Sequence, residues 1–188
     1  ISIAILLGIF SQVYAHKPVL NDNSTYPADA PYEIEKPEIS KAIYSTLTGD
    51  PHYYRIQSEV DFDFYAGILA AKIDNCPLNS KFSFEVLDSE FHKIYLADGE
   101  NFEWTPWYEE FGKQWYWNGP EIGQNFASNE VFKAGTYYIK VFNNSNTGQY
   151  ILAVGDIEKF SFTDIIGLIF SLGDIEDEFW DASKCSST

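Results

Sequence analysis

Short segments in which apolar and polar residues alternate follow one another from residue 39 onward, and turn residues close each of them. Phe62 and Phe64 stand two positions apart, as do Phe82 and Phe84, so each pair places two rings on one face of an extended chain. Gly, Pro, Asn and Asp separate these segments at short intervals. This pattern is typical of antiparallel strands with one buried and one solvated face.

The clearest hairpin signal lies in the last third of the chain. Residues 134–142 and 149–155 are apolar or alternating runs, and the Asn-, Ser- and Gly-containing residues 143–148 between them fit a turn. We therefore predict one all-β domain, an antiparallel β-sandwich of about seven to nine strands. The residues expected to face its core are Phe62, Phe64, Phe82, Phe84, Tyr138, Val141, Ile151 and Ala153.

Composition divides the chain into four parts. Residues 1–15 are predicted to be a signal peptide, because an uncharged apolar run is followed by small residues up to Ala15. Residues 16–38 contain four prolines, which cannot donate to a central ladder, and are predicted to be an extended lead-in over the surface or along a sheet edge. Residues 39–160 form the predicted sandwich domain, and residues 161–188 a short helical or irregular tail.

The charge of the chain narrows the range of partners. Twenty-eight acidic residues against 12 basic residues give a formal net charge of −16. Such a charge repels nucleic-acid phosphates and anionic lipid headgroups, so we exclude nucleic acid as a partner. An acidic surface also keeps an exported protein soluble. Together with the signal peptide, this predicts a secreted or cell-surface protein.

Two further features depend on the compartment. In an oxidising environment Cys76 and Cys185 can form a disulfide if the fold brings them within reach, and two unpaired thiols are the equally weighted alternative. Asn23 and Asn143 stand in the acceptor pattern for N-linked glycosylation. These two asparagines matter only if the source organism glycosylates its proteins.

The predicted hairpin carries a resemblance to known proteins. Residues 134–155, from Ala-Gly-Thr-Tyr-Tyr to Leu-Ala-Val-Gly, resemble the final hairpin of bacterial and archaeal pre-peptidase C-terminal domains, which are small secreted β-sandwiches. The span from His16 to Trp180 is similar to an uncharacterised group of exported prokaryotic proteins, on elements such as residues 116–121 and 153–160. The resemblance implies a sandwich of this type or a jelly roll, and no activity.

Membrane contact is expected only in a limited form. Proteins of the uncharacterised group often continue into a C-terminal membrane helix, which the given sequence lacks. The apolar run at the start is shorter than the roughly 20 residues that a spanning helix needs. We therefore expect the membrane to be involved only through the processing signal or through an anchor that is absent from this sequence.

The common signatures of catalysis are missing from the sequence. It contains no Gly-rich phosphate loop, paired-cysteine zinc spacing, His-Glu-x-x-His motif or nucleophile elbow. His16, His52 and His92 are the three histidines available for a histidine-based centre. We therefore predict a non-catalytic module that binds an envelope glycan or a protein. A structural protein that self-associates into a surface layer or filament is the alternative.

The candidate ligand-binding residues lie in residues 102–126, a segment broken by Gly and Pro that we predict to be a long loop with one short strand. Aromatic faces stack on the apolar face of a sugar ring, and carboxylates accept its hydroxyl hydrogens. The alternative is that these rings are buried at the end of the sandwich. The candidates are Trp104, Trp107, Tyr108, Trp115, Trp117, Glu109 and Glu110.

Two metal sites are weighed against a metal-free surface. If the signal peptide is removed at the predicted position, His16 becomes the first residue and offers its amine and imidazole nitrogens to copper, which would make this a copper-binding protein. Calcium would be held by side-chain oxygens of Asp61, Asp63, Asp98, Glu100 or Asn101, although their spacing is not that of an EF-hand loop. A solvated terminus and solvated turns are the simpler interpretations.

Overall fold

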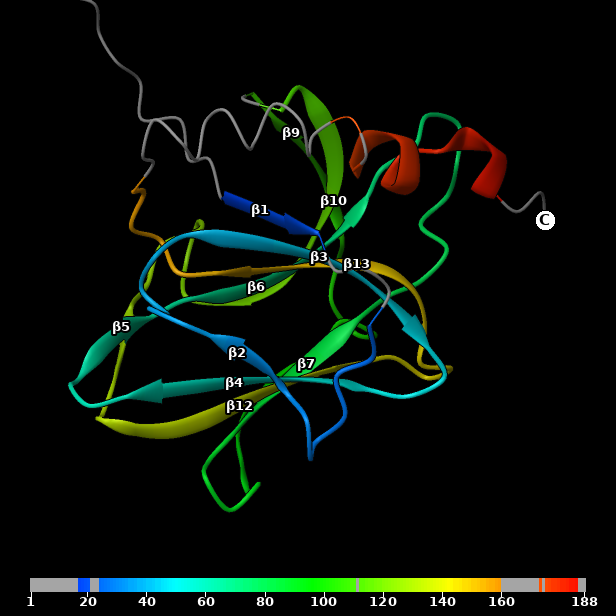
Figure 1. Cartoon of the computed structure of the whole chain (residues 1–188). Coiled ribbons are helices and arrows are strands. Elements are labelled where there is room, and N and C mark those ends of the chain that lie inside the picture. Colours follow the sequence, from blue (N-terminus) through cyan, green and yellow to red (C-terminus); the bar gives the residue numbers. More distant parts are fainter. Residues whose placement is uncertain (1–16, 21–23, 111, 160–172, 174, 186–188) are drawn as a thin grey trace, which may run out of the picture.

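Two stacked β-sheets and a short third pair of strands make up the computed structural model (Figure 1), which describes residues 17–20, 24–110, 112–159, 173 and 175–185. The predicted all-β sandwich is confirmed. The described residues contain thirteen strands, more than the seven to nine expected. The sheets are mixed rather than purely antiparallel, because one edge strand in each sheet pairs parallel to its neighbour.

The larger sheet has six strands. In spatial order they are β1 (Lys17–Leu20), β3 (Lys41–Thr48), β13 (Thr147–Val154), β6 (Ala66–Ala71), β10 (Gln114–Ile122) and β9 (Thr105–Glu109). The pair β1–β3 is parallel, and the other neighbours are antiparallel. Strand β1 contains Pro18 and lies at an edge, where the missing N–H of proline disturbs no central ladder.

The smaller sheet has five strands. In spatial order they are β2 (Tyr32–Ile34), β4 (His52–Ser58), β12 (Gly135–Phe142), β7 (Ser83–Leu87) and β8 (Lys93–Ala97). Strand β2 pairs parallel to β4, and the other pairs are antiparallel. The third pair joins β5 (Phe62–Phe64) to β11 (Glu130–Phe132). The predicted hairpin of residues 134–155 is present as β12 and β13.

The main core lies between the inner faces of the two sheets. Alternate residues of β12 and β13 point into it, among them Ile139, Val141 and Leu152, all of which are fully buried. Of the predicted core residues, Phe62, Phe64, Phe82, Phe84 and Val141 belong to this core. Tyr138 does not: it has the opposite parity to Ile139, and its ring stacks on Phe91 at 4.3 Å outside the sandwich.

A second apolar cluster covers the outer face of the six-stranded sheet. Ile151 and Ala153 of β13 belong to this cluster, so they are buried as predicted but not between the sheets. Residues 175–185, here called the C-terminal strap, bring Ile175 and Phe179 onto this face. The ring of Phe179 packs against Tyr44 of β3 at 5.0 Å. The central strands are therefore buried on both faces, which explains why β6 is an unbroken apolar run.

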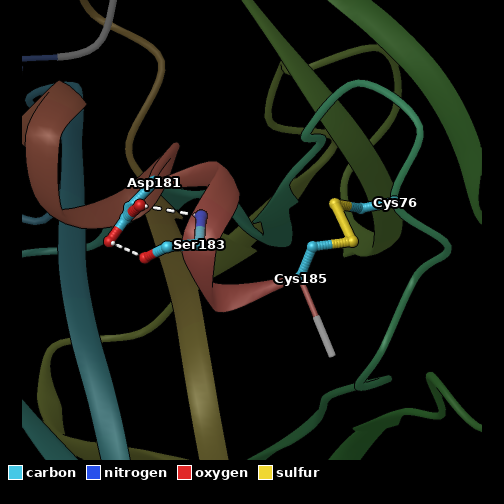
Figure 2. The surroundings of a disulfide bond; sticks show 4 residues. All are labelled: Cys76, Asp181, Ser183 and Cys185. Atoms are coloured by element: carbon cyan, nitrogen blue, oxygen red, sulfur yellow. Dashed lines mark hydrogen bonds between the residues drawn. A yellow bond between two sulfur atoms is a disulfide. The ribbon is translucent and has the colours of Figure 1, made fainter. Parts of the chain in front are cut away.

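A disulfide fastens the strap to the sandwich (Figure 2). Cys76, in the loop after β6, and Cys185 are 109 positions apart in sequence, and their Cα atoms are 5.7 Å apart. Between the helical residues 175–179 and Cys185 lies the 3₁₀ helix η1 (Ala182–Lys184), capped by Asp181, whose carboxylate accepts from the N–H and the hydroxyl of Ser183. Of the two open alternatives for the cysteines, the paired one is present.

Two parts of the sequence-based division of the chain cannot be compared with the structure. The predicted signal peptide, residues 1–15, and most of the first half of the predicted tail lie outside the described residues. In the part of the tail that is described, residues 175–179 are helical, followed by η1. Within the described residues, no helix is long and apolar enough to cross a membrane.

Candidate functional site

Residues 102–126 form a strand hairpin rather than the predicted long loop. Strands β9 and β10 pair from Thr105–Asn118 to Glu109–Gln114, and Figure 1 shows them rising from one end of the six-stranded sheet. Gly119 and Pro120 lie inside β10, where the pairing with β6 shifts by a bulge. A Cβ at Gly119 would lie 2.5 Å from the Trp104 ring and 2.7 Å from the carbonyl oxygen of Ile68. The glycine permits close packing here and does not mark a loop.

The register of the hairpin sorts its aromatic residues onto two faces. Tyr108 lies opposite Trp115, and Trp107 lies opposite Tyr116. Since side chains alternate along a strand, Tyr108, Trp115 and Trp117 share one face, while Trp107 and Tyr116 share the other. The sequence pattern located the aromatic segment but did not predict this separation.

One of these faces, made by Tyr108, Trp115, Trp117 and the neighbouring Lys72, is here called the aromatic face. Trp115 is 42% exposed, and its ring centroid is 5.2 Å from that of Tyr108. The Lys72 ammonium lies 5.4 Å from the centroid of Trp115 and 5.9 Å from that of Trp117, which are cation–π distances. The Asp74 carboxylate is 3.9 Å from the same ammonium. The aromatic face is thus a half-open platform with a cation beside its rings.

The opposite face of the hairpin packs onto the protein. The Trp107 ring lies 4.7 Å from Phe126 and 5.6 Å from Tyr116, whose hydroxyl is 2.8 Å from that of Tyr44. Burial raises the pKa of Tyr44 to about 12 and that of Tyr116 still further, so both hydroxyls stay protonated. The indole N–H of Trp180, from the strap, donates to the carbonyl oxygen of Trp115 at 2.9 Å. This face holds the hairpin in place.

The remaining aromatic and acidic candidates do not join the aromatic face. Trp104 is only 8% exposed and belongs to the main core, and its indole N–H donates to the carbonyl oxygen of Gly99 at 2.8 Å. Its prediction as a ligand-binding ring is wrong, because a buried ring cannot stack on a ligand. Glu109 accepts from the N–H of Gly112 and closes the hairpin turn. Glu110 is exposed in that same turn.

The predicted calcium ligands are not assembled into a site. Asp61 accepts from the Lys133 ammonium at 2.8 Å and from the N–H of Ala134 at 3.0 Å, and the bond from Lys133 is the main reason that the pKa of Asp61 is lowered. Asp63 belongs to β5, away from the turn that follows β8. Among the residues that the structure describes, no group of three or more His, Cys, Asp or Glu side chains could hold a metal ion.

The second pair of predicted calcium ligands serves its own turn. Asp98 accepts from the side-chain amide of Asn101 at 2.7 Å and from the N–H of Glu100 at 3.0 Å, and the bond from Asn101 contributes most to its lowered pKa. The described residues thus do not bring these carboxylates together, Asp98 is used in its own turn, and calcium binding stays a prediction. The copper prediction rests on His16, which lies outside the described residues, and it stays a prediction.

Of the two predicted glycosylation sites, one is described. Asn143 is buried at the start of the β12–β13 turn, where its Oδ1 accepts from the N–H groups of Ser145 and Thr147. Its Nδ2, the atom that would carry a sugar, donates to the carbonyl oxygen of Thr147 at 2.8 Å. In the folded chain the Asn143 side chain organises the turn, and glycosylation at this position stays a prediction. Asn23 lies outside the described residues.

Sequence reasoning missed a buried polar network between the two sheets. His52 of β4 is fully buried, and its Nδ1 lies 2.9 Å from the Tyr150 hydroxyl and 3.2 Å from that of Ser45. The Tyr150 hydroxyl also bonds that of Tyr54. Burial lowers the pKa of His52, because a charged ring would lose its hydration there. A lone histidine in an alternating strand gives no signal from which this arrangement could be predicted.

Sequence reasoning also missed a pocket beside the disulfide, here called the strap pocket. Its volume is about 570 Å³. The loop of residues 73–80, the starts and ends of three strands of the six-stranded sheet, and the strap form its walls. Cys76 lines it on the loop side and Phe179 on the strap side. The walls come from distant parts of the sequence, so no local motif predicts the pocket.

Comparisons with known proteins show limited similarity. No protein-family model matches the sequence, and no curated protein matches it significantly. Among solved structures, the pre-peptidase C-terminal domain of a collagenase from Bacillus anthracis is similar with a TM-score of 0.37 and 12% identity, over 72% of this chain and 98% of that domain. A β-glucosidase from Paenibacillus barengoltzii is similar with a TM-score of 0.26 and 10% identity, over 77% of this chain but only 13% of the enzyme. Neither similarity bears on function.

Proposed function

We propose that this protein is a non-catalytic module that acts outside the cytoplasm and binds glycans on its aromatic face. The observation that carries the proposal is the placement of Trp115: a large ring, 42% exposed, flanked on one face of an edge hairpin by Tyr108 and Trp117. Half-open aromatic residues at a sheet edge offer the kind of surface on which sugar rings stack.

The aromatic face is held rigidly before any ligand arrives. Trp117 is also packed against the main core, and the Lys72 ammonium lies beside both tryptophan rings. The other side of the hairpin is fixed by Trp107, Tyr116 and the strap. A platform that is already ordered loses little conformational entropy on binding, so more of its contact energy becomes affinity.

The proposed location outside the cytoplasm has separate support. The Cys76–Cys185 disulfide is of a kind that persists in oxidising compartments and is rare where thiols are kept reduced. The apolar start of the sequence and the net charge of −16 fit an exported, soluble protein.

Replacing Trp115 tests the proposed function. The purified protein is first screened on a glycan array, and the affinity for a glycan that binds is then measured by isothermal titration calorimetry. We expect Trp115→Ala to weaken binding about tenfold or more, since the lost stacking is worth about 1.4 kcal/mol or more. Phe91→Ala is the matched control, because Phe91 is 43% exposed but lies in the turn between β7 and β8 of the other sheet.

Two results contradict the proposal. One is that no glycan on the array binds, and the other is that Trp115→Ala and Phe91→Ala bind the glycan equally well. Loss of binding in both variants together would point to a general effect on folding, which circular dichroism of the two variants distinguishes from loss of a site.

A structural or assembly role is the second candidate, and the edge strand β8 favours it. β8 is the outermost strand of the five-stranded sheet. Two apolar side chains on it are exposed, Ile94 by 43% and Leu96 by 48%. An exposed edge with apolar side chains can pair with the edge of a second copy. If the protein binds another protein instead of a glycan, the exposed edge of β8 would be the contact surface.

A further inference from the structure

We infer that the ligand is an uncharged oligosaccharide that stacks on the aromatic face and extends into the strap pocket. This inference rests on the proposed function and adds the charge of the ligand, its minimum size and its direction. The observation behind it is that β6 and β13, which are neighbours in the six-stranded sheet, stop pairing before their ends.

The strap pocket opens where β6 and β13 stop pairing. Their ladder runs from Val154 and Ala66 to Ile151 and Leu69 and ends there. Beyond that point Ala70 and Ala71 on β6 line the pocket, as do Gln149 and Gly148, which follow Tyr150 on β13. The pocket is therefore a gap inside the sheet, and it is open to ligands without unfolding any strand.

A glycine keeps part of this gap clear. Gly148 has φ +109°, a backbone conformation that side chains rarely adopt. A Cβ at this position would lie 3.1 Å from the Ser80 hydroxyl and 3.2 Å from the Phe82 ring. Any larger residue would push into the loop that forms the pocket wall, so this wall depends on glycine.

The aromatic face lies mainly on β9 and β10, and β10 is the strand next to the β6 wall of this gap. Ala70, on the pocket wall, is the cross-strand partner of Trp117. The N–H of Lys72 donates to the carbonyl oxygen of Trp115 at 2.9 Å, so the pairing of β6 with β10 extends one residue beyond Ala71 and Tyr116. Neighbouring strands lie about 4.8 Å apart, so the rings of β10 stand roughly one strand spacing from the pocket wall. One sugar ring cannot occupy both places, whereas a short chain can.

The lining of the strap pocket favours an uncharged ligand rich in hydroxyl groups. Four neutral hydrogen-bonding side chains lie among its otherwise mostly apolar lining, namely Thr46, Asn79, Ser80 and Gln149, and none of its lining residues is Lys, Arg or His. The single charged residue in the lining, Glu178, and the net charge of −16 both disfavour an anion. A volume of about 570 Å³ lies in the usual range for small-ligand pockets.

Chain-length dependence of binding tests the inference. Calorimetry on the full chain with its disulfide intact compares an uncharged monosaccharide with uncharged tetrasaccharides of glucose, mannose and galactose, and with tetragalacturonate as the anionic probe. We expect at least one uncharged tetrasaccharide to bind about tenfold more tightly than its monosaccharide, because the longer chain adds hydrogen bonds in the pocket. Tetragalacturonate should bind more weakly than that tetrasaccharide.

A variant that removes a hydrogen-bonding side chain from the pocket shows where the added sugars lie. Asn79→Leu places an apolar side chain at an exposed position of the pocket wall, and Asn129→Leu is the matched control at an exposed asparagine outside the pocket. We expect Asn79→Leu to remove the tenfold gain of the tetrasaccharide and to leave the monosaccharide affinity within about twofold. Asn129→Leu should leave both affinities unchanged.

Different results overturn this inference and the proposed function. A tetrasaccharide gain that is the same in Asn79→Leu and Asn129→Leu overturns the path into the pocket, and tighter binding of tetragalacturonate overturns the uncharged ligand. Both results leave the Trp115 platform in place. Binding that is unaffected by Trp115→Ala, or absent for every probe, overturns the proposed function and this inference with it.

Discussion

At the residue scale, His52 shows how burial fixes the charge of a side chain. Its ring is buried between the sheets with only hydroxyl groups at Nδ1, from Ser45 and Tyr150, and Nε2 has no hydrogen-bond partner in the described part of the chain. Among the residues that the structure describes, no carboxylate is bonded to the ring to stabilise a positive charge there. The neutral form is therefore favoured, which agrees with the lowered pKa of His52.

We expect the free energy of unfolding to fall as the pH drops below about 6.5, the ordinary pKa of histidine in an unfolded chain. As the pH falls, the unfolded chain takes up a proton at His52 before the folded chain does, because the pKa of His52 is lower in the folded chain. The free energy of unfolding therefore decreases by at most about 1.4 kcal/mol per pH unit. Urea unfolding between about pH 7 and about pH 5 measures this slope. His52→Gln, which does not titrate, should flatten the slope; an equal slope in both proteins would contradict the prediction.

Asn143 is a second residue whose role depends on its surroundings. Its amide side chain makes hydrogen bonds to Ser145 and to both the N–H and the carbonyl group of Thr147. We expect Asn143→Ala to lower the free energy of unfolding by about 1–3 kcal/mol, because these backbone groups lose their partner. Chemical denaturation measures the change. Asn144→Ala, at the exposed neighbouring position, should change stability by less than about 0.5 kcal/mol, and equal losses in the two variants would contradict the role of Asn143.

At the scale of single elements, strands were predictable from the sequence, but in a strand buried on both faces the side chains that face the main core were not. The hairpin of β12 and β13 stands out in the sequence, because turn residues separate two apolar runs. Within β13, however, the strap covers the outer face, so Ile151 and Leu152 are both buried and alternation no longer tells the inner face from the outer. The strap lies far from β13 in sequence, and local patterns do not reveal it.

The candidate site was predicted in its composition but not in its geometry. The concentration of tryptophan located the segment that holds the aromatic face. Gly119 and Pro120 suggested a loop, whereas glycine here allows a strand to pass close to the Trp104 ring. Without the strand register, Trp107 and Trp115 were equally good candidates. The strap pocket could not be predicted, because it forms where β6 and β13 stop pairing and no spacing of residues in the sequence shows where that happens.

The edge strand β8 separates the two candidate functions by one measurement. An assembly protein should form multimers that grow with concentration in sedimentation velocity, and Leu96→Lys should return it to a monomer, because a charged edge resists pairing. A binding module should sediment as a monomer with either residue at position 96. Multimers that persist in Leu96→Lys would show that β8 is not the contact, and monomers throughout would contradict the assembly role.

At the scale of the whole molecule, the disulfide contributes stability that the core alone does not supply. Cys76 and Cys185 close a loop of 109 positions, and loops of this length are worth about 4–5 kcal/mol in the chain-entropy view of cross-linking. We expect the double variant Cys76→Ser, Cys185→Ser to lose a free energy of unfolding of this order in urea denaturation. A loss below about 1 kcal/mol would contradict the prediction.

The same cross-link also decides how the protein would respond to a pulling force. A force applied at Cys185 passes through the disulfide to Cys76, in the loop after β6. It therefore does not pull the strap, with Phe179 and Trp180, off the outer face of the six-stranded sheet. The chain between the two cysteines, 109 positions at about 3.4 Å each, is thereby withheld from extension, roughly 370 Å in all. Tension along the chain would therefore not extend the β9–β10 hairpin, which lies between the two cysteines, until the disulfide is reduced.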